Sequence, residues 1–314
     1  MRAIVFTGAG GAEVMALAER PDRVPGSDEV LVAATHSGIN PADVSQRAGN
    51  YPPPPGAPAD VPGLEVCGTV VACGENVTEW REGDRVFGLV GGGGLADRVR
   101  VHARHVARVP DRLNDEQAAA APEAFITAHD AAVRAVHQQP LSRPQPALCE
   151  RGVGLAGVQL GVATGARVLA TVRSDAVRER VAGLGAELVA LDEVRGVDVV
   201  LELVGGPNIP ADLQALSTLG RIVVVSSAAG ESVELPIRLL MGRRATMRGT
   251  LLRARPIEQK AAAVQAFARE VVPLLESGAV EPVVDRVFPA EQAAEAFEHI
   301  QQPGKFGKVL LAWK

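Results

Sequence analysis

The sequence predicts an α/β protein with two domains, a small antiparallel β-barrel and an open, doubly wound parallel sheet. Residues 1–112 contain short Val-rich runs separated by Gly, Pro and Asp, which favours antiparallel strands. Residues 154–226 alternate between helical and strand-like runs, which is typical of βαβ units. At 314 residues, the chain is long enough to build two well-buried cores.

The composition excludes several classes of protein. Hydrophobic residues make up 47% of the chain and charged residues 22%, which is ordinary for a globular protein. The net charge of −5 gives no electrostatic reason to expect nucleic acid or an anionic membrane as a partner. The first residues lack the basic and apolar regions of a signal peptide, so we expect a cytoplasmic protein. The cysteines have the spacing of neither a disulfide framework nor a zinc site.

The barrel is expected to use five runs as strands. They are residues 1–8, 29–40, 68–74, 84–90 and 98–110. Between the second and third run, Asn50–Gly56 is a polyproline-type loop that cannot form a helix. A second loop, Gly91–Gly94, consists of glycine alone.

The helices of the second half begin after a recognisable cap. Asn114 is a plausible N-cap, and Asp115 and Glu116 suit the first turn of a helix that runs to Val136 with a break at Pro122. Further helices are predicted at 154–164, 176–184, 211–218, 261–277 and 290–301. Further strands are predicted at 167–172, 197–203, 221–226, 282–288 and 308–312, and the last two return to the first domain.

A glycine pattern at 152–157 has the spacing of a dinucleotide-binding turn. Gly152, Gly154 and Gly157 would let backbone amides approach a pyrophosphate at a helix N-terminus. The residues before the turn contradict this reading, because 143–146 read Arg-Pro-Gln-Pro where a buried strand is needed. Proline has no N–H for a strand ladder. The pattern therefore indicates a nicotinamide-dependent oxidoreductase with an altered cofactor turn.

Several stretches carry a family resemblance. They are residues 38–43, 51–58, 63–68, 122–128, 249–255, 285–289 and 307–310. The chain resembles the zinc-free quinone oxidoreductase branch of the medium-chain dehydrogenase/reductase superfamily. The resemblance implies a GroES-like β-barrel catalytic domain from 1–122 and 257–314, with an inserted Rossmann cofactor-binding domain at 123–256.

The resemblance also implies chemistry without a metal. Zinc members of the superfamily carry Gly-His-Glu where this chain has Gly63-Leu64-Glu65, and a leucine cannot bind a metal ion. The histidines show no ligand spacing. We therefore expect no metal site.

Two segments depart from the family pattern. Residues 141–151 keep the family's length but not its residues, which either two compensating frameshifts or divergence would produce. Between Leu191 and Val197, a strand–helix passage of the family is reduced to a few residues, so the sheet is expected to lack one helix.

The resemblance and the glycine pattern together imply NADPH as the cofactor. The residues expected to hold it are Gly152, Val153, Gly154, Arg173, Ser174 and Lys308. Arg173 follows a predicted strand where an acidic residue would select NAD, and an arginine there suits the 2′-phosphate of NADP. The alternative for Arg173 is an ordinary exposed arginine, and Glu150 would place a negative charge beside the pyrophosphate.

The resemblance places Tyr51, Asn40 and Thr127 at the catalytic site. The phenol of Tyr51, the only tyrosine, would donate a hydrogen bond and a proton to the acceptor oxygen, and Asn40 would orient the acceptor or the carboxamide. Each has a plainer alternative. Tyr51 would pack against its loop, Asn40 would form a turn before Pro41, and Thr127 would bond to the preceding helical turn.

The predicted function is reduction of a quinone or related electron-poor enone by hydride transfer from NADPH. Two alternatives stay open: an enoyl or alkenal C=C reductase, and a non-enzymatic homologue with a degenerate cofactor site. The expected partners are a small-molecule acceptor and a second copy of the chain. The resemblance places the homodimer contact near Gly249–Leu252.

Overall fold

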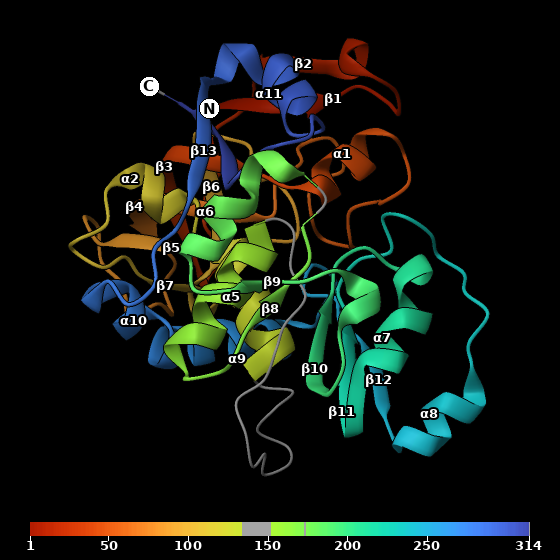
Figure 1. Ribbon diagram of the computed structural model, residues 1–314. Helices are drawn as coiled ribbons and strands as arrows, with labels where there is room; N and C mark the ends of the chain where they lie inside the picture. Colours follow the sequence, from red (N-terminus) through yellow and green to blue (C-terminus); the bar gives the residue numbers. More distant parts are fainter. Residues whose placement is uncertain (134–151, 173, 314) are drawn as a thin grey trace. The chain divides into compact units, whose positions relative to one another are not determined.

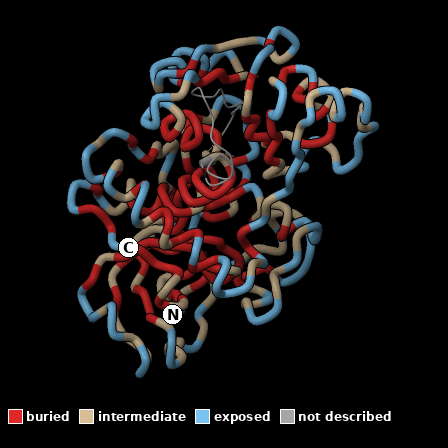
Figure 2. The backbone as a smooth tube through the Cα atoms, turned by 90° about the horizontal axis from the view of Figure 1, so that it is seen from below, coloured by how far each residue is buried: buried red, intermediate tan, exposed pale blue. Residues whose placement is uncertain are grey.

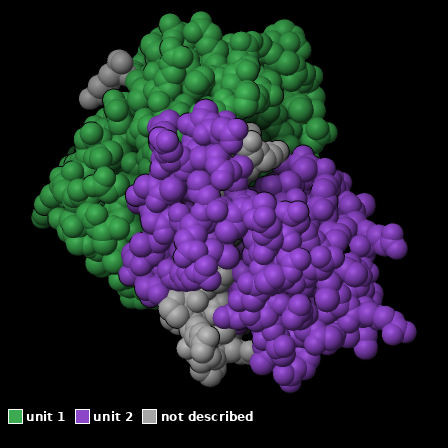
Figure 3. Space-filling model, viewed as in Figure 1, with its two compact units in different colours: residues 1–126, 252–314 green, residues 127–251 purple. Residues whose placement is uncertain are grey.

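The computed structural model describes residues 1–133, 152–172 and 174–313 (Figure 1). The chain forms two compact units. Unit 1 comprises residues 1–126 and 252–314, and unit 2 comprises residues 127–251 (Figure 3). The atypical segment at 141–151 and the predicted cofactor residue Arg173 lie outside the described residues.

Unit 1 is built on a seven-stranded sheet with the order β13-β14-β3-β4-β5-β7, in which β6 also pairs with β3. The strands are β3 (Glu29–Ile39), β4 (Glu65–Cys73), β5 (Arg85–Leu89), β6 (Arg98–His102), β7 (Val106–Arg108), β13 (Val284–Pro289) and β14 (Lys308–Ala312). All pairs except β13–β14 are antiparallel. A separate antiparallel pair joins β1 (Arg2–Phe6) to β2 (Met15–Glu19). These strands confirm the predicted antiparallel β-domain.

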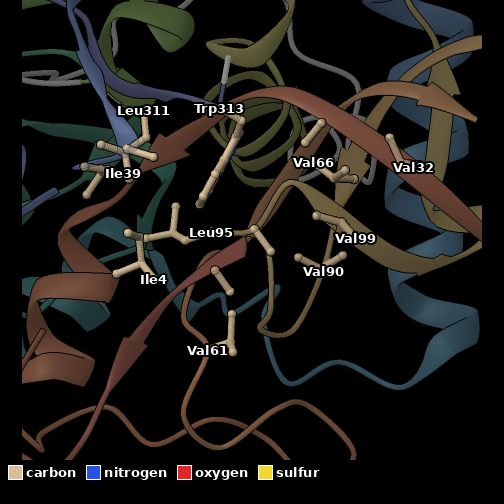
Figure 4. Packing of buried hydrophobic residues seen from close by; sticks show 14 of the residues in the cluster. Ile4, Val32, Ile39, Val61, Val66, Val90, Leu95, Val99, Leu311 and Trp313 are labelled. Atoms are coloured by element: carbon tan, nitrogen blue, oxygen red, sulfur yellow. The ribbon is translucent and has the colours of Figure 1, made fainter. Parts of the chain in front are cut away.

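The core of unit 1 is mainly aliphatic and also includes Phe6, Phe288, Phe297 and Trp313. Side chains from strands that are far apart in the sequence, such as Val32, Val99 and Leu311, meet in one cluster (Figure 4). Trp313 joins this cluster, and its indole N–H donates to the Ser37 hydroxyl at 2.9 Å. The bond satisfies the one polar group of a side chain that is otherwise apolar, so the indole can be buried.

The helices of unit 1 follow local signals. They are α1 (Pro41–Arg47), α2 (Asp115–Ala119), α3 (Pro122–Ala128, which crosses into unit 2), α9 (Ile257–Glu270), α10 (Val272–Ser277) and α11 (Ala293–His299). The predicted cap is confirmed, because the Asn114 side chain accepts from the Gln117 N–H at 2.8 Å. The single helix predicted at 261–277 is wrong: two helices meet at Val271, since Pro273 has no N–H to continue the first.

Unit 2 contains parallel strands separated by helices, as predicted. Its elements are α5 (Gly152–Ala163), β8 (Leu169–Ala170), α6 (Arg178–Gly183), β9 (Glu187–Leu188), β10 (Val197–Glu202), α7 (Ile209–Ala215), β11 (Leu216–Val224), α8 (Ile237–Arg243) and β12 (Thr246–Gly249). Strands β10, β11 and β12 form one parallel sheet, and β8 pairs with β9 in parallel. Buried and exposed stretches alternate along the chain (Figure 2). In unit 2, β10 is almost wholly buried and β12 is wholly exposed.

Two sequence predictions in unit 2 concern the length of an element, and a third concerns a missing helix. The strand predicted at 167–172 is only the two residues of β8, and the helix predicted at 211–218 ends at Ala215, where β11 begins. The missing helix is confirmed, because only a 3₁₀ turn at Leu191–Glu193 lies between β9 and β10. In the described ranges, no helix has both the length and the apolar character needed to cross a membrane.

Candidate active site

A buried polar cluster in unit 1 brings together two of the predicted site residues. Lys308 Nζ lies 2.6 Å from Glu65 Oε1, and the Asn40 amide donates to the same oxygen at 2.9 Å. Lys308 also donates to Asn40 Oδ1. The Lys308 and Glu65 side chains are 7% and 2% exposed, so this is an ion pair inside the protein. Because both polar atoms of the Asn40 amide are bonded, the orientation of the amide is fixed.

The strands explain why these residues meet. Asn40 follows the last residue of β3, Lys308 begins β14, and the pairing of Ile39 with Val309 sets the two side by side. Gly38 leaves room for the ion pair, since a Cβ there would lie 2.1 Å from Glu65 Oε1. Glu65 Oε2 accepts the Glu123 N–H at 2.9 Å in the first turn of α3. Both oxygens of the Glu65 carboxylate are therefore bonded, as a buried charge requires.

Asp43 anchors the backbone beside this cluster. Its carboxylate accepts the Asn40 N–H at 2.8 Å and the Gly63 N–H at 2.9 Å. Burial raises the pKa of Asp43 to about 6. The two N–H donors and the positive charges of Lys308 and Arg253 lower it, but by less than burial raises it. Gly63 has a φ of +103°, a conformation that strongly favours glycine. Asp43 therefore ties the start of α1 to the segment that leads into β4.

Tyr51 lies in the proline-rich loop, defined as residues 50–58, and is held by Arg253. The Arg253 guanidinium donates to Tyr51 O at 3.0 Å and to Gly91 O at 2.9 Å, and it also donates to Gln46 Oε1. Its Cζ lies 4.8 Å from the centre of the Tyr51 ring. This contact is close enough for a cation–π interaction.

The Tyr51 phenol is half-buried and has no bonding partner in the part of the chain that the structure describes. Burial raises its pKa, and the charge of Arg253 opposes that rise. A neutral phenol with an unoccupied O–H can donate to an oxygen atom of a ligand. This is the chemistry that the sequence predicts for Tyr51.

In unit 2, the loops that follow β10 and β11 meet backbone to backbone. Gly205 has a φ of +110°, and a Cβ there would lie 2.7 Å from Ser227 Cα. The Ala229 N–H donates to Val204 O at 2.9 Å. These loops lie at the carboxyl ends of parallel strands, where open α/β sheets bind their ligands.

Two carboxyl groups, one at the end of β10 and one in α7, lie close together in unit 2. Glu202, the last residue of β10, accepts from the Val204 and Gly205 N–H groups and from the Asn208 amide. Asp212 of α7 is completely buried, and among the described residues no N–H or O–H donor reaches its oxygens. Burial, a hydrogen bond to Glu202 and the charge of Glu202 raise the pKa of Asp212 far above its ordinary value. Asp212 is therefore the partner that keeps a proton.

The predicted phosphate turn is described only from Gly152 onward. Gly152 and Val153 are partly exposed in the first turn of α5, and Gly154 is buried. Ser174 directly precedes the 3₁₀ turn Asp175–Val177, and its side chain does not cap that turn. A helix that begins with small, partly exposed residues fits a dinucleotide phosphate. The described residues therefore fit the pyrophosphate of a nicotinamide dinucleotide, and Arg173, which would select NADPH, lies outside them.

The predicted site residues are thus divided between the units. Asn40, Tyr51 and Lys308 lie in unit 1, whereas Thr127, buried in α3, lies in unit 2 with the turn residues of α5 and Ser174. Their roles stay predictions. Sequence reasoning gave no role to Glu65, Asp43 or Arg253, although charged residues within apolar or glycine-rich runs were a signal for them. In the described ranges, no group of three His, Cys, Asp or Glu side chains could hold a metal ion.

Comparison with known proteins defines the class. The model of the alcohol dehydrogenase GroES-like domain matches residues 26–111, and that of a zinc-binding dehydrogenase matches residues 171–311. Quinone oxidoreductase of Mus musculus is 32% identical over 333 residues, which cover 99% of this chain and 97% of the relative. The protein from Sus scrofa is 31% identical with the same coverage. The chain belongs to the medium-chain dehydrogenase/reductase superfamily, as its sequence motifs predicted.

Within that superfamily, the chain is quinone oxidoreductase-like. Solved structures agree with this placement. An alcohol dehydrogenase superfamily protein from Novosphingobium aromaticivorans is 30% identical, with a TM-score of 0.86 and complete coverage of both chains. Mycobacterial Rv1454c, solved in complex with NADPH, is 26% identical with the same TM-score and coverage. The predicted fold class, a GroES-like domain and a Rossmann-like parallel sheet, is confirmed.

Proposed function

We propose that this protein reduces quinones or related electron-poor enones with NADPH and without a metal ion. The observation that carries the proposal is the Tyr51 phenol, which has no partner among the described residues and lies against the Arg253 guanidinium. The quinone oxidoreductases that resemble the chain along its whole length support it.

The cofactor would be held mainly by unit 2. NADPH, when bound, would supply the hydride. We assign the pyrophosphate to the backbone of Gly152, Val153 and Gly154, and the 2′-phosphate to Arg173 and Ser174. Lys308 stays a predicted cofactor residue, and its bonds to Glu65 and Asn40 indicate that it also orients the Asn40 amide.

The acceptor would be bound by neutral donors. Tyr51 would donate a hydrogen bond to the acceptor oxygen and pass its proton there as negative charge develops. Asn40 would use the second hydrogen of its fixed amide to orient a carbonyl group. Thr127 is assigned to the site by resemblance to the family alone.

The test is NADPH oxidation by the purified protein with 1,4-naphthoquinone and, separately, with a 2-enal. Faster turnover of the quinone supports the proposal, and faster turnover of the 2-enal supports the C=C reductase instead. Tyr51→Phe should lower kcat by roughly 10²-fold or more if the phenol is the proton donor. If no acceptor is reduced and NADPH causes no thermal shift, the non-enzymatic alternative holds.

We also propose that the protein is a homodimer through β12. This strand pairs with β11 along one edge, and all four of its residues are exposed. An exposed strand edge is a template for pairing with another strand. Light scattering should give twice the chain mass, and Arg248→Pro should give a monomer. A monomeric wild-type protein would refute the proposal.

A further inference from the structure

Arg253 is a buried cation with no carboxylate of the described residues in salt-bridge contact. It is 6% exposed, and within the described part of the chain it makes no ion pair. Its three acceptors are two backbone carbonyls and the side-chain amide of Gln46. Burial lowers the pKa of Arg253, and the more distant carboxylates of Asp43 and Glu123 offset this cost only in part. A cation kept there at this cost suggests a role beyond packing.

The contacts of Arg253 join segments that are far apart in the sequence. The guanidinium connects α1, the proline-rich loop and the glycine loop after β5, through Gln46, Tyr51 and Gly91. The two loops also pack against each other, since a Cβ at Gly91 would lie 3.1 Å from Pro54 Cγ. Arg253 is itself held, because Lys260 donates to its carbonyl at 2.9 Å. One rigid side chain therefore sets the position of the loop that carries Tyr51.

The charge of Arg253 also acts on the phenol. Among the described residues, the charged groups that act on Tyr51 are Arg253, Glu123 and Asp43. Burial raises the pKa of the phenol most, the two carboxylates add to that rise, and Arg253 lowers the pKa. A phenol whose pKa is raised by burial is a poorer proton donor. The positive charge of Arg253 therefore counteracts this effect of burial on the phenol.

We propose that Arg253 is a positioning residue that fixes the proline-rich loop and makes the Tyr51 phenol a better proton donor. Its effect on catalysis rests on the proposed function, whereas its effects on the loop and on the phenol do not. The two can therefore be tested separately.

The direct test uses the fact that Tyr51 is the only tyrosine of the chain. Absorbance titration of the phenolate reports its pKa alone, with circular dichroism to confirm that each sample is folded. Arg253→Met should raise this pKa by about one pH unit, because a positive charge near the ring is lost. Arg253→Lys keeps the charge and should leave the pKa close to that of the wild type. Arg269→Met, which removes an exposed arginine of α9 in the same unit, is the matched control.

The positioning role is tested by hydrogen exchange of residues 48–60. Exchange should be faster in both Arg253 variants, because neither methionine nor lysine can replace the three bonds of the guanidinium fork. If Arg253→Met does not fold, Arg253→Lys still decides this part. An unchanged exchange rate in Arg253→Lys, or an unchanged phenol pKa in folded Arg253→Met, would overturn the proposal.

Kinetics then connect the inference to function. In Arg253→Met, kcat should fall about tenfold, its basic pH limb should move upward, and the KM for NADPH should stay within about twofold. A wild-type protein without reductase activity would refute the proposed function and leave the titration and exchange results valid. An active wild type with no change in Arg253→Met would refute the inference alone.

Discussion

The buried Glu202–Asp212 pair makes stability depend on pH in a way that one substitution should remove. Glu202 accepts three hydrogen bonds from neighbouring donors and carries the charge, while Asp212 keeps a proton because its pKa is raised. In the unfolded chain, Asp212 would lose that proton above a pH of about 4. The folded state therefore holds one more proton than the unfolded state over the neutral range.

The sign and size of the effect follow from this difference. Because the folded state binds the extra proton, the stability that it provides is complete below a pH of about 4 and is lost as the pH rises toward the folded pKa. The loss is about 1.4 kcal/mol of unfolding free energy per pH unit for one proton. Asp212→Asn has no such proton, and its amide can still donate to Glu202. The variant should therefore lose this slope while keeping the fold.

Urea unfolding of both proteins at intervals between about pH 5 and pH 8 provides the measurement. The difference between wild type and variant cancels the contributions of all other groups. Asp175→Asn, at a position where the side chain is 98% exposed, is the control and should follow the wild-type curve. If wild type and Asp212→Asn show parallel curves, the carboxyl groups do not share a proton and the reasoning is wrong.

Two further predictions concern unit 1. Gly38→Ala should lower the free energy of unfolding by about 3 kcal/mol, because the new Cβ would displace the Glu65 carboxylate from Lys308 and leave a buried charge unpaired. Urea unfolding measures this loss, and a loss below about 1 kcal/mol would show that the ion pair adapts. His105 should titrate near pH 4 in an NMR titration, because burial lowers its pKa to about 4. The hydrogen bond with Ile257 O raises the pKa, but by less than burial lowers it. The contribution of His105 to stability is then lost as the pH falls from about 6.5 toward 4, and a titration above pH 6 would contradict the burial.

The sequence determined the fold class because its signals are local. Val-rich runs between turn residues gave the antiparallel strands of unit 1, and alternating periods gave the parallel sheet of unit 2. The Asn114 cap acts over three residues, so it too could be read from the sequence. Two errors concern element length, which the neighbouring elements set: β8 keeps two residues, and α7 ends at Ala215 because β11 begins at Leu216. The helix predicted at 261–277 was wrong for a local reason, because Pro273 divides it.

The candidate site was decided by tertiary structure. Asn40 and Lys308 are 268 residues apart and meet because β14 pairs with β3 in one register. Tyr51 and Arg253 are 202 residues apart and meet because the guanidinium bonds to the backbone of a loop. The sequence could name the phenol and the amide from the family motifs, but not the charges placed against them. Electrostatic interactions depend on distance and burial, and only the folded chain fixes those quantities.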